Sequence, residues 1–349
     1  MRVTHNMLTR NYLKNLNNNM TNLSKSNERM TSQRKFNTAS ENVADASRAL
    51  RVRVQLTNNE VYKSNVRDAK GKFTMIEDSM QSINKITQNV ASLTVQGLNG
   101  TMAPEEKEKI AREIETLQDQ ILQVSNSRFG DKYIFGAAGN KDGSAPYTLG
   151  GADGKQLMYN GTIVDDMVKG TGVNTGKVMV ADATAPGGFK EIPYNSKNYL
   201  DIGLGFTVKN GYVDPRTALE YSVSGVESLG FGKTENGSPN NLYGILGSIA
   251  QNLRDGNSTE LGQNLKSMNE QSDQLLMHLS TIGTRTAYIE QIDERLGNST
   301  FSLQKIQNDL EAVPIQEESI YNKDYEMSWM VTLQMGAKIL PTSIFDFLR

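Results

Sequence analysis

Residues 261–310 have the sequence LGQNLKSMNEQSDQLLMHLSTIGTRTAYIEQIDERLGNSTFSLQKIQNDL. Within this stretch an apolar residue returns at every seventh position: Leu261, Met268, Leu275, Ile282, Ile289, Leu296, Leu303 and Leu310. A sustained seven-residue repeat keeps one apolar edge of a helix facing a partner helix, as in a coiled coil. The stretch therefore predicts one long helix in an elongated rod of coiled-coil or bundle helices. A helix of a globular bundle is the plainer alternative.

The N-terminal part of the chain has a similar pattern. Apolar residues with one polar member follow one another at alternating steps of three and four: Leu13, Leu16, Met20, Leu23, Asn27 and Met30. Farther along, residues 73–93 carry an apolar stripe at helical spacing, so a second amphipathic helix is predicted there. It is expected to end near Asn99.

Prolines mark the other helix boundaries. Pro104 suits the first turn of a third helix, because a proline loses no hydrogen bond in that position. This helix is expected to stop at Phe129. Pro314 predicts a joint, since a proline inside a helix costs about 3 kcal/mol. A last helix is expected over residues 316–339, and Pro341 ends it.

The middle of the chain differs in composition. Residues 130–240 hold 20 of the 30 glycines and 5 of the 8 prolines. Because glycine and proline mark turns, short strands and loops are expected here, between two helical arms. The predicted fold class is therefore mainly α with a β-rich insertion.

The totals exclude several classes of protein. The 349 residues carry a formal net charge of −2, which gives no overall attraction to nucleic acid or anionic membranes. The chain has no cysteine, so disulfides, thiolate metal sites and cysteine nucleophiles are excluded. No run of 18 apolar residues occurs, and the first 20 residues lack the apolar core of a secretory signal. A soluble, unprocessed protein is expected.

The two ends of the chain have opposite charge. Residues 1–53 hold ten Lys or Arg and three acids, whereas residues 309–349 hold seven acids and three bases. Amphipathic helices of opposite charge are suited to pair, so the two ends are expected to lie side by side. A helix pair of this size buries little surface, so it is expected to be loose in the monomer and to order on assembly. Trp329, the only tryptophan, is expected to pack in the assembled core.

The residues expected to form the assembly interface are the apolar ones of these two end segments. They are Leu13, Leu16, Met20, Leu23, Met30, Ile320, Met327, Met330, Leu333, Ile339, Leu340, Ile344, Phe345, Phe347 and Leu348. The last six belong to an apolar C-terminal tail, which is unusual for the end of a soluble chain.

Three short segments resemble ligand or catalytic motifs. Residues 227–234, ESLGFGKT, nearly fit a phosphate-binding loop, but Glu227 occupies the position of the first glycine, so a simple loop is favoured. Residues 202–205, IGLG, lack the third glycine of a dinucleotide turn and favour a strand edge or bulge. Asp165 and Asp166 are adjacent and point apart, which favours a turn or a strand edge over a pair of catalytic carboxylates.

The remaining polar residues predict no chemistry either. His5 and His278 fall in separate predicted helices, so exposed histidines are expected rather than metal ligands. A solvated or partner-facing surface, rather than a nucleic-acid site, is expected for the basic cluster Arg48, Arg51 and Arg53. We therefore predict no catalytic residue, no cofactor and no metal site. The protein is not expected to be an enzyme.

Four stretches match a known pattern. They are MRVTHNML at residues 1–8, FGDKYIFGAAGNKDGSAPY at 129–147, IGTRTAYIEQ at 282–291 and LQMGAKILPTSIFDFLR at 333–349. Together they resemble the bacterial flagellar axial proteins of the flagellin family, and within it the hook-associated proteins. The segment from Thr31 to Asp45 departs from the family pattern, because Gln33 stands where the family has a glycine and Ala39 where it has a proline.

The resemblance implies an architecture in layers. Residues 1–48 and 315–349 are expected to form an inner coiled-coil domain. Residues 49–165 and 241–314 are expected to form a helical rod domain with a β-hairpin, and residues 166–240 an outer β-rich domain.

The resemblance also implies a function. The chain is expected to be a structural junction protein that joins the flagellar hook to the filament, exported without a cleaved signal peptide and located in the extracellular flagellum. Its expected partners are further copies in a ring layer, another hook-associated junction protein, flagellin, and a cytoplasmic export chaperone that binds the C-terminal region. The alternatives are a minor flagellin and, from another class, a secreted coiled-coil binding protein.

Overall fold

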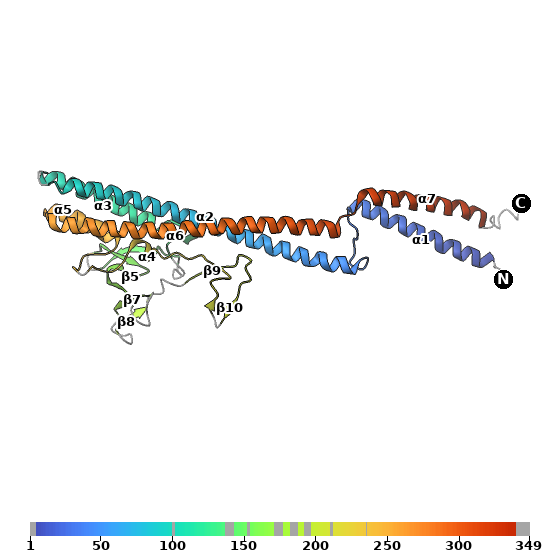
Figure 1. Ribbon diagram of the computed structural model, residues 1–349, viewed down its shortest axis with the longest axis horizontal. Coiled ribbons are helices and arrows are strands. Elements are labelled where there is room, and N and C mark those ends of the chain that lie inside the picture. The colour runs from blue at the N-terminus through green and yellow to red at the C-terminus, as the bar shows by residue number, and fades with distance from the viewer. Residues whose placement is uncertain are drawn as a thin grey trace. The chain divides into compact units, whose positions relative to one another are not determined.

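The structure, a computed structural model, describes residues 5–99, 102–136, 143–151, 154–170, 177–181, 188–191, 197–209, 212–234 and 236–339. The helices in this part of the chain are α1 (His5–Ser32), α2 (Val43–Gly97), α3 (Pro104–Ser125), the 3₁₀ helix η1 (Val164–Asp166), α4 (Gly225–Leu229), α5 (Leu242–Asp255), α6 (Ser258–Glu311) and α7 (Ile315–Ile339). The predicted fold class is confirmed, because long helices from both arms flank a small β region (Figure 1).

The strands are short. They are β1 (Arg128–Phe129), β2 (Lys132–Tyr133), β3 (Tyr147–Gly150), β4 (Gln156–Tyr159), β5 (Thr162–Ile163), β6 (Met167–Lys169), β7 (Val178–Ala181), β8 (Phe189–Glu191), β9 (Tyr199–Leu200), β10 (Val208–Lys209), β11 (Tyr212–Val213) and β12 (Leu219–Glu220). Two three-stranded antiparallel sheets have the orders β3-β4-β5 and β6-β7-β8. Three antiparallel pairs, β1-β2, β9-β12 and β10-β11, complete the described part of this region.

The chain divides into two compact units. The terminal unit comprises Met1–Glu60 and Gly297–Arg349, and the central unit comprises Val61–Leu296. Both α2 and α6 contribute residues to both units, because Glu60 and Gly297 lie inside these helices. The finer three-layer division expected from the sequence stays a prediction.

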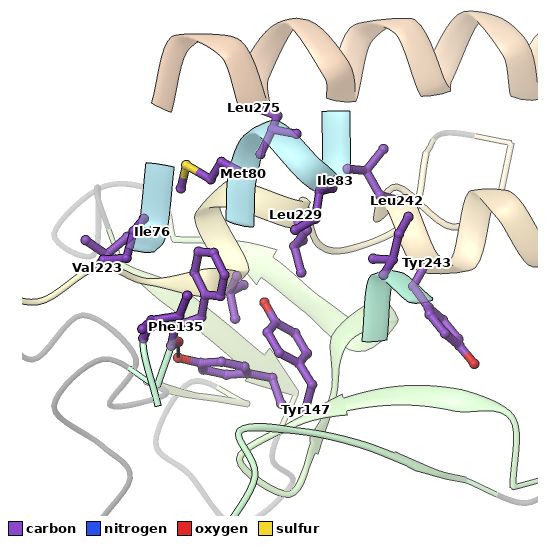
Figure 2. Packing of buried hydrophobic residues seen from close by; sticks show 14 of the residues in the cluster. Ile76, Met80, Ile83, Phe135, Tyr147, Val223, Leu229, Leu242, Tyr243 and Leu275 are labelled. Atoms are coloured by element: carbon purple, nitrogen blue, oxygen red, sulfur yellow. Dashed lines mark hydrogen bonds between the residues drawn. The ribbon is translucent and has the colours of Figure 1, made fainter. Parts of the chain in front are cut away.

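The long helices of the central unit bury the apolar stripes that the sequence predicts. The heptad residues of α6 in this unit are all buried: Leu261, Met268, Leu275, Ile282, Ile289 and Leu296. From α2, five members of the stripe over 73–93 are fully buried: Phe73, Ile76, Met80, Ile83 and Val90. These residues belong to one hydrophobic cluster, part of which is drawn in Figure 2. The heptad of α6 is thus confirmed as a buried edge.

The third helix begins at Pro104 as predicted but ends at Ser125, four residues before Phe129. The next residue, Asn126, turns its side chain to strand β3. Its Nδ2 donates to the carbonyl of Tyr147 at 2.8 Å, and its Oδ1 accepts from the backbone N–H of the same residue at 3.0 Å. An asparagine that satisfies the backbone of a neighbouring strand competes with helix propagation, which accounts for the earlier end.

The β region packs on the helices through buried aromatic residues. The rings of Tyr147 and Tyr159 lie 5.0 Å apart, and the Tyr159 hydroxyl donates to the carbonyl of Phe135 at 2.9 Å. Burial raises the pKa of the Tyr159 phenol. Phe135 follows the β1-β2 hairpin, which lies in the stretch where the sequence predicts one. The carbonyl of Phe135 also accepts the backbone N–H of Gly225 at 3.2 Å, so this aromatic group links the small sheets to α4.

The terminal unit contains the predicted joint. Helix α6 ends at Glu311 and α7 starts at Ile315, so Pro314 lies between two helices, as expected. Along the described residues, no helix is both long and apolar enough to cross a membrane.

Candidate assembly interface

Helices α1 and α7 lie side by side in the terminal unit (Figure 1). Asn19 Nδ2 donates to Thr332 Oγ1 at 2.8 Å, and Asn322 Nδ2 donates to Asn27 Oδ1 at 2.8 Å. Residue numbers rise along one helix as they fall along the other, so the pair is antiparallel. The expectation that the two arms pair is confirmed.

The inner seam of this pair consists of buried and half-buried residues at alternating steps of three and four. On α1 these residues are Tyr12, Leu16, Asn19, Leu23, Ser26 and Met30. On α7 they are Glu318, Asn322, Tyr325, Trp329, Thr332 and Gly336. All but three of the twelve are polar, aromatic or small. Hydrogen bonds and close contact, rather than aliphatic packing, therefore hold this seam together.

The closest approach of the two helices is at Gly336. A Cβ atom at this position would clash with the ring carbon Cζ and the hydroxyl oxygen of Tyr12. Only a residue without a side chain leaves room for the tyrosine, which is itself buried. Gly336 thus sets the distance between α1 and α7 near the start of α1 and the end of α7.

Many large apolar side chains of the two helices lie off the inner seam and are exposed. We call these the outer apolar faces: Met7, Leu8, Leu13 and Met20 on α1, and Ile315, Ile320, Tyr321, Met327, Met330, Val331, Leu333 and Met335 on α7. Met20 and Ile320 are 62% and 63% exposed. A soluble monomer rarely presents so many exposed apolar residues together.

The residues predicted for the assembly interface therefore fall into three groups. Leu16, Leu23 and Met30 lie on the inner seam. The outer apolar faces contain Leu13, Met20, Ile320, Met327, Met330 and Leu333. Ile339 ends α7, but its side chain lies outside the described residues, as do Leu340, Ile344, Phe345, Phe347 and Leu348.

A wide groove runs beside the inner seam. Its volume is about 880 Å³, and Trp329 of α7 lines it together with Met20 and Leu23 of α1. The only tryptophan of the chain is half-buried here. Packing of Trp329 in an assembled core stays a prediction. In the single chain, the side chain of Trp329 lines this groove.

Two features hold the joint between α1, α2, α6 and α7. Arg53 and Glu311 form a bidentate pair, with Nε to Oε1 and Nη2 to Oε2 both at 2.8 Å. The hydrogen bonds that Arg53 donates to this carboxylate raise the pKa of its guanidinium. The backbone N–H of Val313 donates to the carbonyl of Gln33 at 3.1 Å. Arg53, from the predicted basic cluster, thus has a partner in the chain, as does Arg48, which lies 3.8 Å from Asp45.

Gln33 is itself unusual. Its φ is +56°, in the left-handed region that favours glycine. It follows the last residue of α1, the position at which helices commonly end in a glycine. The structure thus gives the reason why the family pattern has a glycine at this point.

The central unit places the motif-like segments in structural roles. Residues 227–234 do not have the geometry of a phosphate-binding loop, because helix α4 precedes the Gly-Lys-Thr instead of following it. The Gly232 N–H already donates to the Val164 carbonyl at 3.0 Å. In the IGLG segment, Gly203 packs against the ring of Tyr62 and the Asp201 carbonyl accepts from Asn65 Nδ2 at 2.9 Å. The segment is thereby fastened to α2.

The adjacent acids Asp165 and Asp166 face different partners. Asp165 accepts from Asn241 Nδ2 at 2.5 Å, and partial burial raises the pKa of its carboxyl group despite the nearby Lys233. Asp166 lies 3.2 Å from Lys233 Nζ. The two residues end the short 3₁₀ helix η1, directly before strand β6, and their carboxylates have separate partners. Among the described residues, no group of three or more His, Cys, Asp or Glu side chains is placed to hold a metal ion.

A polar row on α6 was not predicted from the sequence. Asn264, Gln271, His278 and Arg285 are spaced by seven and lie three positions after the apolar heptad residues. Gln271 Nε2 donates to Asn240 Oδ1 at 2.9 Å, and Arg285 lies 3.5 Å from Glu220. This row thus fastens the β region to α6. Its seven-residue spacing is the signal that could have revealed it.

Comparisons with known proteins bear on the identity of the chain. Residues 3–139 match the family model of the bacterial flagellin N-terminal helical region. Flagellin B of Vibrio anguillarum is 27% identical over 199 residues, which is 56% of this chain and 50% of that protein. Flagellar hook-associated protein 3 of Escherichia coli K12 is 26% identical over 160 residues, or 44% of this chain and 50% of that protein.

A solved structure has a similar fold. The flagellar hook-associated protein from Vibrio parahaemolyticus superposes with a TM-score of 0.55 at 14% identity, covering 78% of this chain and all of that one. At this identity the likeness concerns the fold. The curated relatives are matched over half of their length or less. The chain is thus similar to flagellins and to hook-associated flagellar proteins, and its N-terminal part matches the flagellin family model.

Proposed function

We propose that this protein is a hook–filament junction protein equivalent to flagellar hook-associated protein 3. It joins the hook, through another hook-associated protein, to the filament of flagellin. The proposal is supported by the fold, which resembles that of a hook-associated protein, and by the match to hook-associated protein 3 of E. coli. The composition of the terminal helix pair supports it further.

One observation carries this proposal: the inner seam of the terminal helix pair is rich in polar, aromatic and small residues, while many large apolar side chains of both helices are exposed. A pair built in this way gains little stability from burial within one chain. Its outer apolar faces lose their contact with water only when further chains cover them. The mechanism is therefore templated polymerisation, in which a preceding layer covers the outer apolar faces of each incoming subunit.

The residues outside the described part have a place in the same mechanism. The C-terminal tail carries four further large apolar residues in the sequence: Ile344, Phe345, Phe347 and Leu348. A cytoplasmic chaperone that binds the C-terminal region would shield it before export without a cleaved signal. The inner layer would then comprise residues 1–48 and 315–349, with residues 166–240 on the outside.

Removal of the gene from the source bacterium tests the proposal. Cells without the protein should carry hooks that lack filaments and should release flagellin into the medium, because flagellin then has no layer on which to polymerise. The double variant Met327→Asp/Met330→Asp should fail to restore filaments, since it charges the outer face of α7. Gln334→Asp, at an exposed polar position of α7, should restore them. Normal filaments in the deletion strain would refute the junction role.

A minor flagellin is the second candidate. Flagellin B of Vibrio anguillarum matches 56% of this chain, a larger share than the 44% matched by hook-associated protein 3 of E. coli. Purified protein that forms filaments without a template would favour it. A secreted coiled-coil binding protein would instead bury its apolar residues within the monomer, and removal of both terminal segments would unfold it.

A further inference from the structure

A small cavity lies in the terminal unit beside the start of α7. Its volume is about 280 Å³, and its charged lining residues are Arg29, Lys35, Glu41, Glu317 and Glu318. Three carboxylates thus face two bases. The cavity is large enough for the end of one long side chain, and its acid excess favours a cationic one.

Glu318 carries the argument. The residue is only 7% exposed, and its Oε1 atom is buried with no hydrogen-bond partner among the described residues. A buried carboxylate oxygen without a donor is costly, because it has lost its water and gained nothing in exchange. Native proteins rarely keep such a group unless something else completes it.

The bases of the same cavity do not complete this carboxylate. Lys35 Nζ donates to the backbone carbonyl of Asp309 at 2.6 Å. Arg29 lines the cavity, but within the described part of the chain no ion pair joins it to Glu318. Glu41 accepts the backbone N–H of Asn37 at 3.2 Å and so is already engaged. Among the described residues, no donor is thus placed to complete the Oε1 atom of Glu318.

Unpaired cations are present on α1. Lys14 and Lys25 are exposed and make no ion pair within the described residues. They lie eleven residues apart, which is close to three full helical turns, so both project from the same side of α1. That side is not the inner seam, because each lysine is two positions past a seam residue, namely Tyr12 and Leu23. One chain thus offers both an unpaired buried acid and unpaired outward lysines.

We propose that a lysine of α1 from a second copy of this chain, Lys14 or Lys25, enters the cavity and pairs with Glu318. The contact is heterologous, because donor and acceptor lie on different surfaces of the same chain. Each copy can then donate to one neighbour and accept from the next, which is the arrangement that builds a ring or a helical layer. This assignment rests on the proposed function and names the residues that join neighbouring copies in a layer.

Charge substitutions in the full-length chain test the assignment. Association between copies is measured by sedimentation at rising protein concentration and low salt, where ion pairs are least screened. Glu318→Gln keeps the shape of the side chain and should weaken association about tenfold, while leaving the fold intact. Glu317→Gln, at an exposed residue of the same cavity, should weaken it less than about threefold.

A charge swap identifies the donor. Copies with Glu318→Lys should not associate with themselves, and neither should copies with Lys14→Glu and Lys25→Glu. A mixture of the two should associate again, because each contact in alternating copies then pairs opposite charges. Failure of the mixture to associate, while the wild type does, would overturn the assignment.

Other outcomes overturn it in distinguishable ways. If Arg29→Gln destabilises the monomer and Glu318→Gln leaves association unchanged, the carboxylate is completed within its own chain. If Glu318→Gln impairs only the binding of the preceding junction protein, the cation comes from that protein. If wild-type copies associate neither with one another nor with isolated hooks, the proposed function fails together with the assignment.

Discussion

The two units use the same heptad spacing in opposite ways. In the central unit, α6 turns Leu261, Met268 and Leu275 inward, and all three are buried. In the terminal unit, α7 turns Asn322, Trp329 and Gly336 inward, also seven apart, while Met327, Met330 and Leu333 face outward. The spacing of a heptad therefore sets which residues share a face, and the chemistry of that face decides whether it is covered within the chain or by another one.

The largest contrast is expected between two methionines. Met268→Ala should lower the free energy of unfolding of the central unit by about 2–5 kcal/mol, because it leaves a cavity in a fully buried place. Met327→Ala should change monomer stability by less than about 0.5 kcal/mol, since its side chain is 59% exposed. Denaturant unfolding followed by circular dichroism measures both. Similar losses in the two variants would remove the distinction between the units.

Lys72 offers a pH-dependent contrast inside the central unit. It is buried, its Nζ donates to the Tyr221 carbonyl at 3.0 Å, and burial followed by the nearby Lys132 charge lowers its pKa to about 8. Between about pH 8 and 10.4 the unfolded chain therefore binds more protons than the folded one, so stability should rise with pH by about 3 kcal/mol. Below pH 8 both states hold the proton and this contribution to the slope disappears.

Two variants isolate the effect of Lys72. Lys72→Met should abolish the rise in stability between about pH 8 and 10.4. Lys85→Met, at an exposed position of the same helix, should keep it. Chemical unfolding in a series of buffers gives the comparison, and an unchanged slope in Lys72→Met would contradict the assignment.

Two glycines sharpen the contrast between inner seam and exposed helix surface. Gly336→Ala should loosen the α1–α7 pair by about 1–3 kcal/mol, because the new methyl group meets Tyr12. Gly297→Ala should instead stabilise its helix by about 1 kcal/mol, since nothing lies within 4 Å of the added carbon. Limited proteolysis of α1 and α7 reports the difference. Equal protection in both variants would show that the two helices do not approach closely at Gly336.

The smallest effect concerns the end of α1. Gln33→Gly should stabilise the terminal unit by about 1 kcal/mol, because a glycine adopts the positive φ without strain. Gln33→Ala keeps the strain and should bring no such gain. Thermal unfolding of the two variants separates the backbone effect from the loss of the side chain, and equal midpoints would argue against a strained Gln33.

Much of the helical architecture could be predicted because its signals are local and repeated. The heptad of residues 261–310 predicts α6 almost to its ends, and Pro104 and Pro314 mark boundaries that the structure confirms. The strands could only be expected as a class. The described strands have two to four residues each, too few to show an alternation of apolar and polar residues. Their positions depend on contacts with residues outside the strands, such as the hydrogen bond from Asn126 to Tyr147.

The inner seam could be predicted only in part. Leu16, Leu23 and Met30 were expected on it for their apolar side chains, and they lie there. The other seam positions of α1 are occupied by Tyr12, Asn19 and Ser26. Each lies one residue before the position expected from the pattern, which was Leu13, Met20 or Asn27. Selection by hydrophobicity assumes that the covered face is the apolar one, and here polar side chains from the distant α7 complete it. A search for polar residues spaced by seven would have found this row.

The place of Trp329 has a practical consequence. The chain has one indole, and it borders the groove between α1 and α7. Its fluorescence therefore reports on the terminal unit alone, while the central unit contributes only tyrosine emission. Contact with a neighbouring chain should move the emission maximum to shorter wavelength as water leaves the ring. Trp329 is thus an intrinsic fluorescence probe in the unit that is proposed to contact neighbouring chains.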